Sequence, residues 1–234
     1  NSKVLLKFLS TQDTDRLASR NVVPYTDFPR YITNQFNSGS AIASGGSVSS
    51  SSNNIQLNQL PDYFIICVRK QMSSQTMTDS DSFLKITKAT FNLNNMSGLL
   101  STASAQQLWR LSAKSGSTQN YQEFGGYAWD NGVAGTGGAQ VPTTGSLLVI
   151  SPVDLSLPSY LAPGSLGNFQ LSLELTVENQ SAEAVTAELV VIAVNSGFMV
   201  TEQGQSSIYT GILTREAVLD AKVQKPVASE MVER

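Results

Sequence analysis

Between Phe169 and Val177 the sequence alternates apolar and polar residues without interruption. Successive side chains of a β-strand point to opposite faces, so this alternation predicts a strand with one face in a core and the other toward solvent. No other stretch constrains the fold as strongly. The apolar set is Phe169, Leu171, Leu173, Leu175 and Val177, and the polar set is Gln170, Ser172, Glu174 and Thr176.

Similar apolar or β-branched segments recur along the whole chain. Eight or nine such segments, joined by long polar loops, predict an all-β fold, namely an antiparallel jelly-roll β-sandwich with one or two short helices. Prolines at 24 and 29 favour edge positions for the first two segments. The candidate segments, from which the eight or nine strands are expected to come, are residues 4–9, 21–25, 30–33, 55–57, 63–69, 84–93, 147–150, 169–177, 187–194, 198–200 and 207–209.

A short helix is predicted between Ser104 and Gly116. Ser104 is a favourable N-cap, and Gln107 three residues later completes a capping box. Gly116 stands where a left-handed C-terminal cap would fall. We expect Leu108, Trp109 and Leu111 to anchor this helix against the end of a sheet.

Composition limits the classes of partner. The chain has 234 residues, of which 41% are hydrophobic and only 14% are charged, compared with roughly 25% charged residues in typical soluble domains. A net charge of −3 supplies no basic surface for nucleic acid. No apolar stretch approaches the roughly 20 residues of a membrane span. A surface low in charge but rich in neutral polar residues suits a protein that contacts copies of itself, and it suits a secreted module equally well.

The sequence shows little catalytic chemistry. The absence of histidine excludes His-based triads and most zinc sites, and the single Cys67 fits a buried strand position. Asp79 and Asp81 could offer oxygen ligands to calcium, although a solvated loop is the favoured interpretation. Glu123 and Asp130 lack the acid/base pattern of a glycosidase. We therefore predict no enzyme, no catalytic residue, no metal and no cofactor.

The chain is predicted to divide into residues 1–213, a single jelly-roll domain, and residues 214–234, a short helix with a C-terminal tail. Within the domain, the Ser/Gly-rich stretch 39–54 is expected to form a flexible surface loop. In the tail, Thr214 could cap a helix over residues 215–222, and the last dozen residues could reach an assembly partner. Because the chain begins at Asn1 without Met, we expect a piece of a longer polyprotein or coat subunit.

A long Gly-rich stretch from 117 to 144 carries Tyr121, Phe124, Tyr127 and Trp129. Loops of this length are usually functional or packed by their own side chains. The four aromatic residues are candidate interface anchors, since Tyr and Trp are enriched at subunit contacts. They could instead form a sugar-binding platform, or they could fold inward and cover an open end of the sandwich.

Several segments, taken in order, resemble the double-jelly-roll major capsid proteins of Polinton-like elements, virophages and their adenovirus-like relatives. The first is LNQLPDYFIICVR at 57–69, which resembles a proline, aspartate, apolar strand and arginine pattern of that family. The others are FNLNNMSGLLS with the following LWRLSAKSG at 91–116, GSLL at 145–148 with DLSL at 154–157, LAPG at 161–164 with NFQL at 168–171, and YTGILT at 209–214.

The resemblance implies a structural protein of the virion capsid, specifically the second jelly roll of a two-barrel subunit. Three such subunits form a trimeric, pseudo-hexagonal capsomer that tiles an icosahedral shell. The implied partners are copies of the chain and other capsid proteins. The strands of this chain account for only one barrel, so a fragment or a separately expressed half is expected.

A second class of function remains open at this point. A jelly-roll carbohydrate-binding module would use the aromatic residues between 121 and 129 as its site. Oligomeric state separates the two hypotheses, because a shell protein should form trimers or larger assemblies while a binding module would usually stay monomeric.

Overall fold

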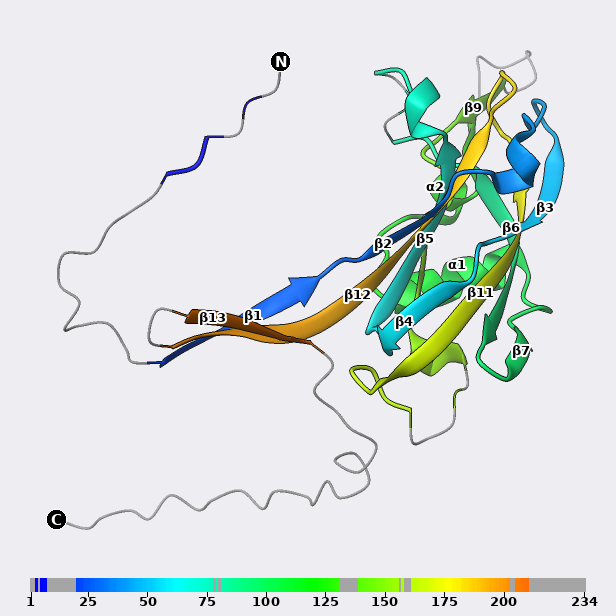
Figure 1. Ribbon diagram of the computed structural model, residues 1–234. Helices are drawn as coiled ribbons and strands as arrows, with labels where there is room; N and C mark the ends of the chain where they lie inside the picture. The colour runs from blue at the N-terminus through cyan, green and yellow to red at the C-terminus, as the bar shows by residue number, and fades with distance from the viewer. Residues whose placement is uncertain are drawn as a thin grey trace, which may run out of the picture.

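Strands distant in sequence pair into two antiparallel sheets in the computed structural model (Figure 1). The structure describes residues 3, 5–7, 20–77, 79, 81–130, 139–155, 157, 161–202 and 205–210. The predicted helix and tail at 214–234 lie outside these residues. None of the described helices is long and apolar enough to cross a membrane.

The first sheet is centred on a long strand, β12, that pairs along both edges. One edge of β12 carries β2 and then β1, and the other carries β5 and then β13, with β10 beyond β5. The bounds are β1 Arg20–Asp27, β2 Arg30–Thr33, β5 Tyr63–Lys70, β10 Leu148–Ile150, β12 Ala187–Glu202 and β13 Gln205–Thr210.

The second sheet is organised in the same way around β11. One edge of β11 carries β4 and then β3, and the other carries β6, followed by β7. The bounds are β3 Ser47–Ser51, β4 Ile55–Gln59, β6 Lys85–Leu93, β7 Met96–Leu99 and β11 Leu166–Glu178.

The connectivity of these strands is that of a jelly roll. Because β1 and β2 follow one edge of β12, and β3 and β4 follow one edge of β11, each couple acts as one interrupted strand. Counted this way, the two sheets have the chain orders first–eighth–third–sixth and second–seventh–fourth–fifth. Two interlocked Greek keys of this kind make a double-sheet jelly roll. The predicted antiparallel β-sandwich is confirmed.

The core lies between the two sheets. All five apolar residues of the alternating stretch, from Phe169 to Val177, are at most 5% exposed. They join one buried cluster with residues of the facing sheet, such as Phe64, Ile66 and Leu189. The strand predicted from alternation is therefore confirmed together with the direction of its inner face.

The sequence analysis expected a loop throughout residues 39–54, but part of this stretch forms a strand. Ser47–Ser51 form β3, which pairs with β11 along Glu174–Glu178. Serine side chains take part in this pairing, since the hydroxyls of Ser49 and Thr176 lie 2.8 Å apart. The strand is specified by its distant partner, and its own sequence offers only Val48 as an apolar residue packed against the core.

The distal half of β12 leaves the sandwich and forms a three-stranded ribbon with β1 and β13 (Figure 1). We call this ribbon, residues 20–27, 195–202 and 205–210, the β-arm. The sequence analysis placed separate strands at 187–194 and 198–200, whereas the structure has one strand through Asn195, Ser196 and Gly197. A Cβ at Gly197 would collide with the carbonyl oxygen of Tyr209, so glycine here permits the close pairing of β12 with β13.

Short elements close the ends of the sandwich. Helix α1 (Ala105–Lys114) contacts β10 of one sheet and β6 of the other, and therefore bridges the two layers (Figure 1). The remaining elements are α2 Tyr121–Phe124, the hairpin of β8 Tyr127–Asp130 with β9 Ala139–Pro142, and the 3₁₀ turns η2 Phe36–Gly39, η3 Met72–Ser74 and η4 Pro152–Leu155.

Candidate functional site

Helix α1 begins and ends as its sequence predicts. The Ser104 hydroxyl accepts a hydrogen bond from the Gln107 amide at 3.4 Å, and the Gln107 side-chain oxygen accepts one from the Ser104 amide at 2.8 Å. Gly116 has a φ of +100°, the left-handed conformation that favours glycine. Both predicted ends of this helix are confirmed.

The three candidate anchors of α1 have different environments. Leu108 is fully buried in the core between the sheets, and Trp109 packs against that core from its edge. Leu111 is half-buried and lines an open groove of about 510 Å³, together with Leu100 and Arg110. The helix therefore presents one face to the core and a second, partly apolar face to solvent.

Trp109 links α1 to the aromatic stretch. Its ring meets that of Tyr121 edge to face, with centroids 5.6 Å apart, and its indole N–H donates to the carbonyl of Gln119 at 2.8 Å. Edge-to-face pairs of this kind stabilise by about 0.5–1.5 kcal/mol beyond the area they bury. Tyr121 remains 44% exposed, so this pair forms an aromatic surface at the end of the sandwich.

The four aromatic candidates do not form one platform. Tyr127 lies beneath the ammonium of Lys85, with the nitrogen 5.4 Å from the ring centroid, and shares a pocket of about 170 Å³ with Tyr121 and Gly125. Phe124 is only 1% exposed and belongs to the core. Trp129 is in β8, and its side chain lies outside the described part of the structure.

Sequence reasoning missed the polar residues that fasten this aromatic segment to the sandwich. The Ser112 hydroxyl accepts from the Val149 amide at 3.0 Å and donates to the Leu147 carbonyl at 3.2 Å, which satisfies edge groups beside β10. The Gln119 side chain likewise contacts the backbone of Leu147 and Gly145. Such contacts join residues that are far apart in the sequence, so no local sequence pattern predicts them.

Gly145 and Ser146 make the closest attachment. A Cβ at Gly145 would collide with the Phe83 carbonyl oxygen, and its φ is +84°. The buried Ser146 hydroxyl donates to the Phe124 carbonyl at 2.6 Å and accepts from the Ile86 amide at 2.9 Å. Gly145 and Ser146 lie in one of the segments that carried the family resemblance. No other feature of the sequence indicated their role in this attachment.

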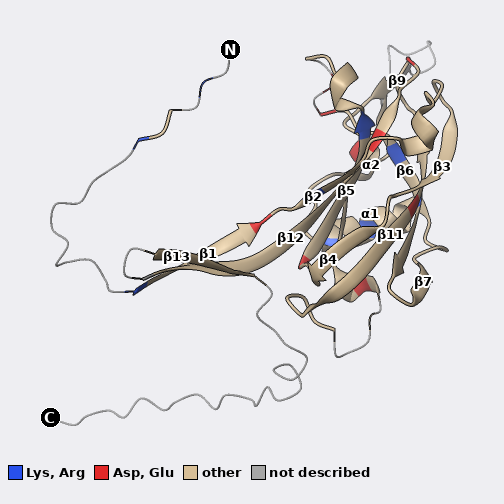
Figure 2. Cartoon of the chain, in the orientation of Figure 1, with Lys and Arg blue, Asp and Glu red and all other residues tan. Residues whose placement is uncertain are grey.

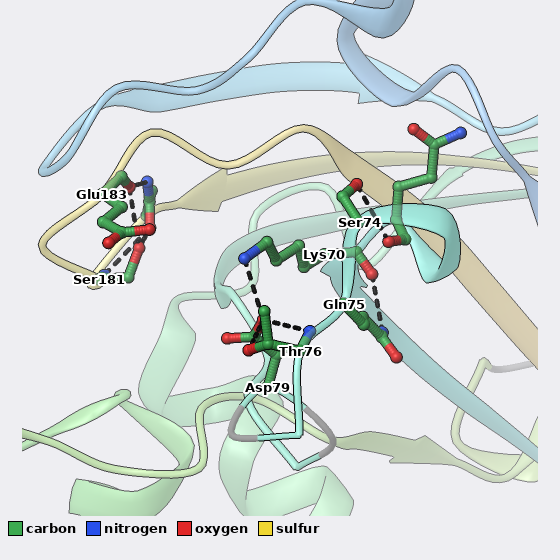
Figure 3. Close-up of polar contacts among 9 residues, drawn as sticks. Lys70, Ser74, Gln75, Thr76, Asp79, Ser181 and Glu183 are labelled. Carbon is green, nitrogen blue, oxygen red and sulfur yellow. Dashed lines mark hydrogen bonds and ion pairs between the residues drawn. The ribbon is translucent and has the colours of Figure 1, made fainter.

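The loop that contains Asp79 is held by its own polar contacts (Figure 3). Asp79 Oδ2 accepts from the amide and hydroxyl of Thr76, both at 2.8 Å, and from Lys70 Nζ at 2.9 Å. The hydrogen bond from the Thr76 amide, followed by those from Lys70 and the Thr76 hydroxyl, lowers the pKa of Asp79 to about 2. This carboxylate is therefore occupied by protein donors.

Asp79 also lines a pocket of about 390 Å³ that faces the turn after β11. Across the pocket, the Ser181 hydroxyl donates to the Asn179 side chain at 2.6 Å and to the Glu183 carbonyl at 2.9 Å (Figure 3). On each wall of the pocket, side chains form hydrogen bonds with groups of the same wall. The pocket therefore lies between two loops that are each held in place by hydrogen bonds.

The described residues bring no group of three or more His, Cys, Asp or Glu side chains together. Cys67 is buried in β5, and burial raises the pKa of its thiol to about 11, so the thiolate is scarce at neutral pH. The described surface offers the aromatic pair of Trp109 and Tyr121, the partly apolar face of α1 around Leu111, and the β-arm.

These surfaces lie on a double-sheet jelly roll. The chain belongs to the family of the major capsid protein V20 C-terminal domain, whose sequence model matches residues 28–197.

Individual relatives agree with this assignment. The Sputnik virophage protein V20, which is named as a capsid protein, is 28% identical over 98% of this chain and 40% of its own length. A chain in the cryo-EM structure of the Sputnik virophage is 27% identical, with a TM-score of 0.78 over 91% of this chain and 43% of that one. The crystal structure of the mavirus major capsid protein has the same fold, with a TM-score of 0.69 at 14% identity over 93% of this chain and 47% of that one.

The comparisons confirm the resemblance to virophage major capsid proteins and the predicted jelly roll. This chain spans less than half the length of the relatives it matches.

Proposed function

We propose that this chain is a non-enzymatic structural part of a virion capsid, the second jelly roll of a longer major capsid subunit. Three such subunits form a pseudo-hexagonal capsomer, and capsomers tile an icosahedral shell. The observation that carries the proposal is the match of residues 28–197 to the V20 C-terminal domain, a range that covers most of the jelly-roll body.

The architecture suits a building block of a shell. The two sheets share one continuous core, and α1 bridges their edges, so the sandwich is a rigid block. Rigid blocks with little charge pack side by side at low electrostatic cost. Only 14% of this chain is charged.

Tyr121 and Tyr127, with Trp109 beneath Tyr121, are the proposed contacts between subunits. Tyrosine is enriched where interfaces exclude water, because it adds area at a small cost in conformational entropy. Phe124 is buried in the chain's own core, so it is not proposed as a contact with another subunit. Trp129 is proposed as a contact from its sequence position alone.

The test is assembly of the longer subunit that contains this chain. We expect trimers in sedimentation analysis and shell-like particles in electron micrographs. Tyr121→Ala should weaken trimer formation, whereas Met72→Ala, which removes an exposed apolar side chain from a loop elsewhere on the body, should not. A subunit that stays monomeric and binds a glycan would overturn the capsid assignment in favour of a carbohydrate-binding module.

A further inference from the structure

The β-arm is apolar on both of its faces. Its register places Val23, Met199 and Ile208 in one row across the three strands, and Pro24, Phe198 and Tyr209 in the next. Neighbouring rows point to opposite faces. The stacked rings of Phe198 and Tyr209, with centroids 5.4 Å apart, confirm that cross-strand partners share a face.

The described part of the chain leaves both apolar faces of the β-arm exposed. Val22, Val23, Ile208 and Tyr209 are between 48% and 56% exposed, and they lie on different faces of the same thin ribbon. Antiparallel sheets commonly cover one face with a core and leave a polar face to solvent. Contiguous exposed apolar surface on a folded protein usually marks an interaction site.

Charge is absent from the middle of the β-arm. Residues 21–26, 195–201 and 205–210 contain no Asp, Glu, Lys or Arg, and charges stand only at Arg20 and Glu202 near the tip and at Asp27 near the base. Figure 2 shows this uncharged stretch between the tip and the body. Two identical surfaces can meet here without bringing like charges together, as a contact between copies requires.

One edge of the β-arm is also open. β13 pairs only with β12 among the described strands, so its outer backbone groups form an unpaired edge. An unpaired edge is a template for pairing with another chain. The opposite edge, β1, carries Pro24, which lacks an N–H and interrupts such pairing.

The size of the β-arm indicates how much of it a partner must cover. Eight residues rising about 3.3 Å each, across three strands about 4.8 Å apart, give a face of roughly 350–400 Å². Covering one face would bury about 700–800 Å² in total, below what specific interfaces need, whereas covering both would bury about 1,500 Å², a standard interface.

We infer that the β-arm binds a second copy of this chain, which covers both apolar faces and approaches the open edge of β13. This inference rests on the proposed capsid function, and it assigns the β-arm to contacts between neighbouring capsomers.

The first experiment measures self-association of the intact 234-residue chain by sedimentation velocity at increasing concentration. We expect concentration-dependent association, which Val22→Asp and Val23→Asp, on opposite faces of the β-arm, should each weaken about tenfold or more in dissociation constant. Val153→Asp is the matched control, because Val153 is 66% exposed on the body and should leave association unchanged.

The second experiment follows hydrogen exchange in the wild-type chain and needs no variant. We expect the amides of residues 205–210 to become more protected as concentration rises, while the amides of the already paired β6 do not change. Melting curves of the variants separate loss of association from loss of folding.

Three outcomes overturn the inference: association that both arm variants leave unchanged, β13 protection that is independent of concentration, or a wild-type chain that stays monomeric. If the longer subunit nevertheless forms shells, the β-arm assignment fails and the capsid function stands. If the longer subunit forms no shell, the capsid function fails. A monomeric wild-type chain at every concentration would also exclude a second copy as the partner.

Discussion

The body and the β-arm are built on the same strand and have opposite environments. In the body, β12 is flanked by β2 and β5, and Ala187, Leu189 and Val191 are at most 1% exposed. In the β-arm, the same strand is flanked by β1 and β13, and among its described side chains only Asn195, at the base, and Val200 are buried. Both halves of β12 have a partner strand along each edge. The difference shows that hydrogen bonding extends a strand, whereas burial against a second layer requires another sheet.

Two consequences follow for stability. The body should resist unfolding as one cooperative unit, because its buried residues form a single cluster. The β-arm should open at a lower free energy, since three strands without a covered face are only marginally stable.

The largest expected effect is a cavity in the body. Phe91 in β6 is fully buried in the core, so Phe91→Ala should lower the free energy of unfolding by about 3–5 kcal/mol. Urea denaturation followed by circular dichroism measures this change. A loss below about 1 kcal/mol would show that the sandwich core collapses around the cavity and is less rigid than we argue.

The next effect separates the two faces of α1. Leu108→Ala should cost about 2–5 kcal/mol, because Leu108 is fully buried. Leu111→Ala serves as its matched comparison on the same helix and should cost clearly less, since Leu111 is half-buried and faces an open groove. Equal costs for the two variants would contradict this orientation of the helix.

A smaller effect is expected in the β-arm. Tyr209→Ala removes the ring that stacks on Phe198, an interaction of about 0.5–1.5 kcal/mol. We expect faster hydrogen exchange in residues 205–210 at low protein concentration, with the urea midpoint of the body unchanged. A shifted midpoint would mean that the β-arm and the body unfold together.

The smallest effect concerns pH. The pKa of Asp79 is lowered from 3.8 to about 2, so its contacts with Thr76 and Lys70 stabilise the loop above about pH 4, and this contribution is lost as the pH falls toward 2. The protection of the amides of residues 71–77, measured relative to their intrinsic exchange rate at each pH, should therefore fall in acid in the wild type. Asp79→Asn should remove this pH step without changing exchange in the β-arm, where residues 205–210 carry no titratable carboxylate.

Much of the body could be predicted from sequence because its signals are local. The alternation from Phe169 to Val177 gave both the strand and its inner face, and Ser104 with Gln107 gave the start of α1. These patterns depend on backbone geometry within a few residues.

The remainder depends on partners far along the chain. β3 is a serine-rich strand that forms by pairing with β11, which lies more than a hundred residues away in the sequence. The contact between Ser49 and Thr176 shows this pairing. The sequence analysis expected separate strands at 187–194 and 198–200, whereas Gly197 continues β12 because it permits the close approach of Tyr209. The aromatic set from Tyr121 to Trp129 was identified by composition, but composition could not show that Phe124 turns inward. The division at residues 213 and 214 stays a prediction.

The unbroken run of β12 from Ala187 to Glu202 has a mechanical consequence. A pull on the β-arm along its length enters the body as tension in a single backbone, where β5 pairs with residues 187–194 on one side and β2 pairs with residues 189–192 on the other. Hydrogen bonds perpendicular to that pull are loaded together in shear, so they must break as a group and cannot be peeled apart one at a time. If neighbouring capsomers are joined through their β-arms, pressure inside the shell is carried in each chain by the segment of β12 that is paired on both sides within the jelly-roll body.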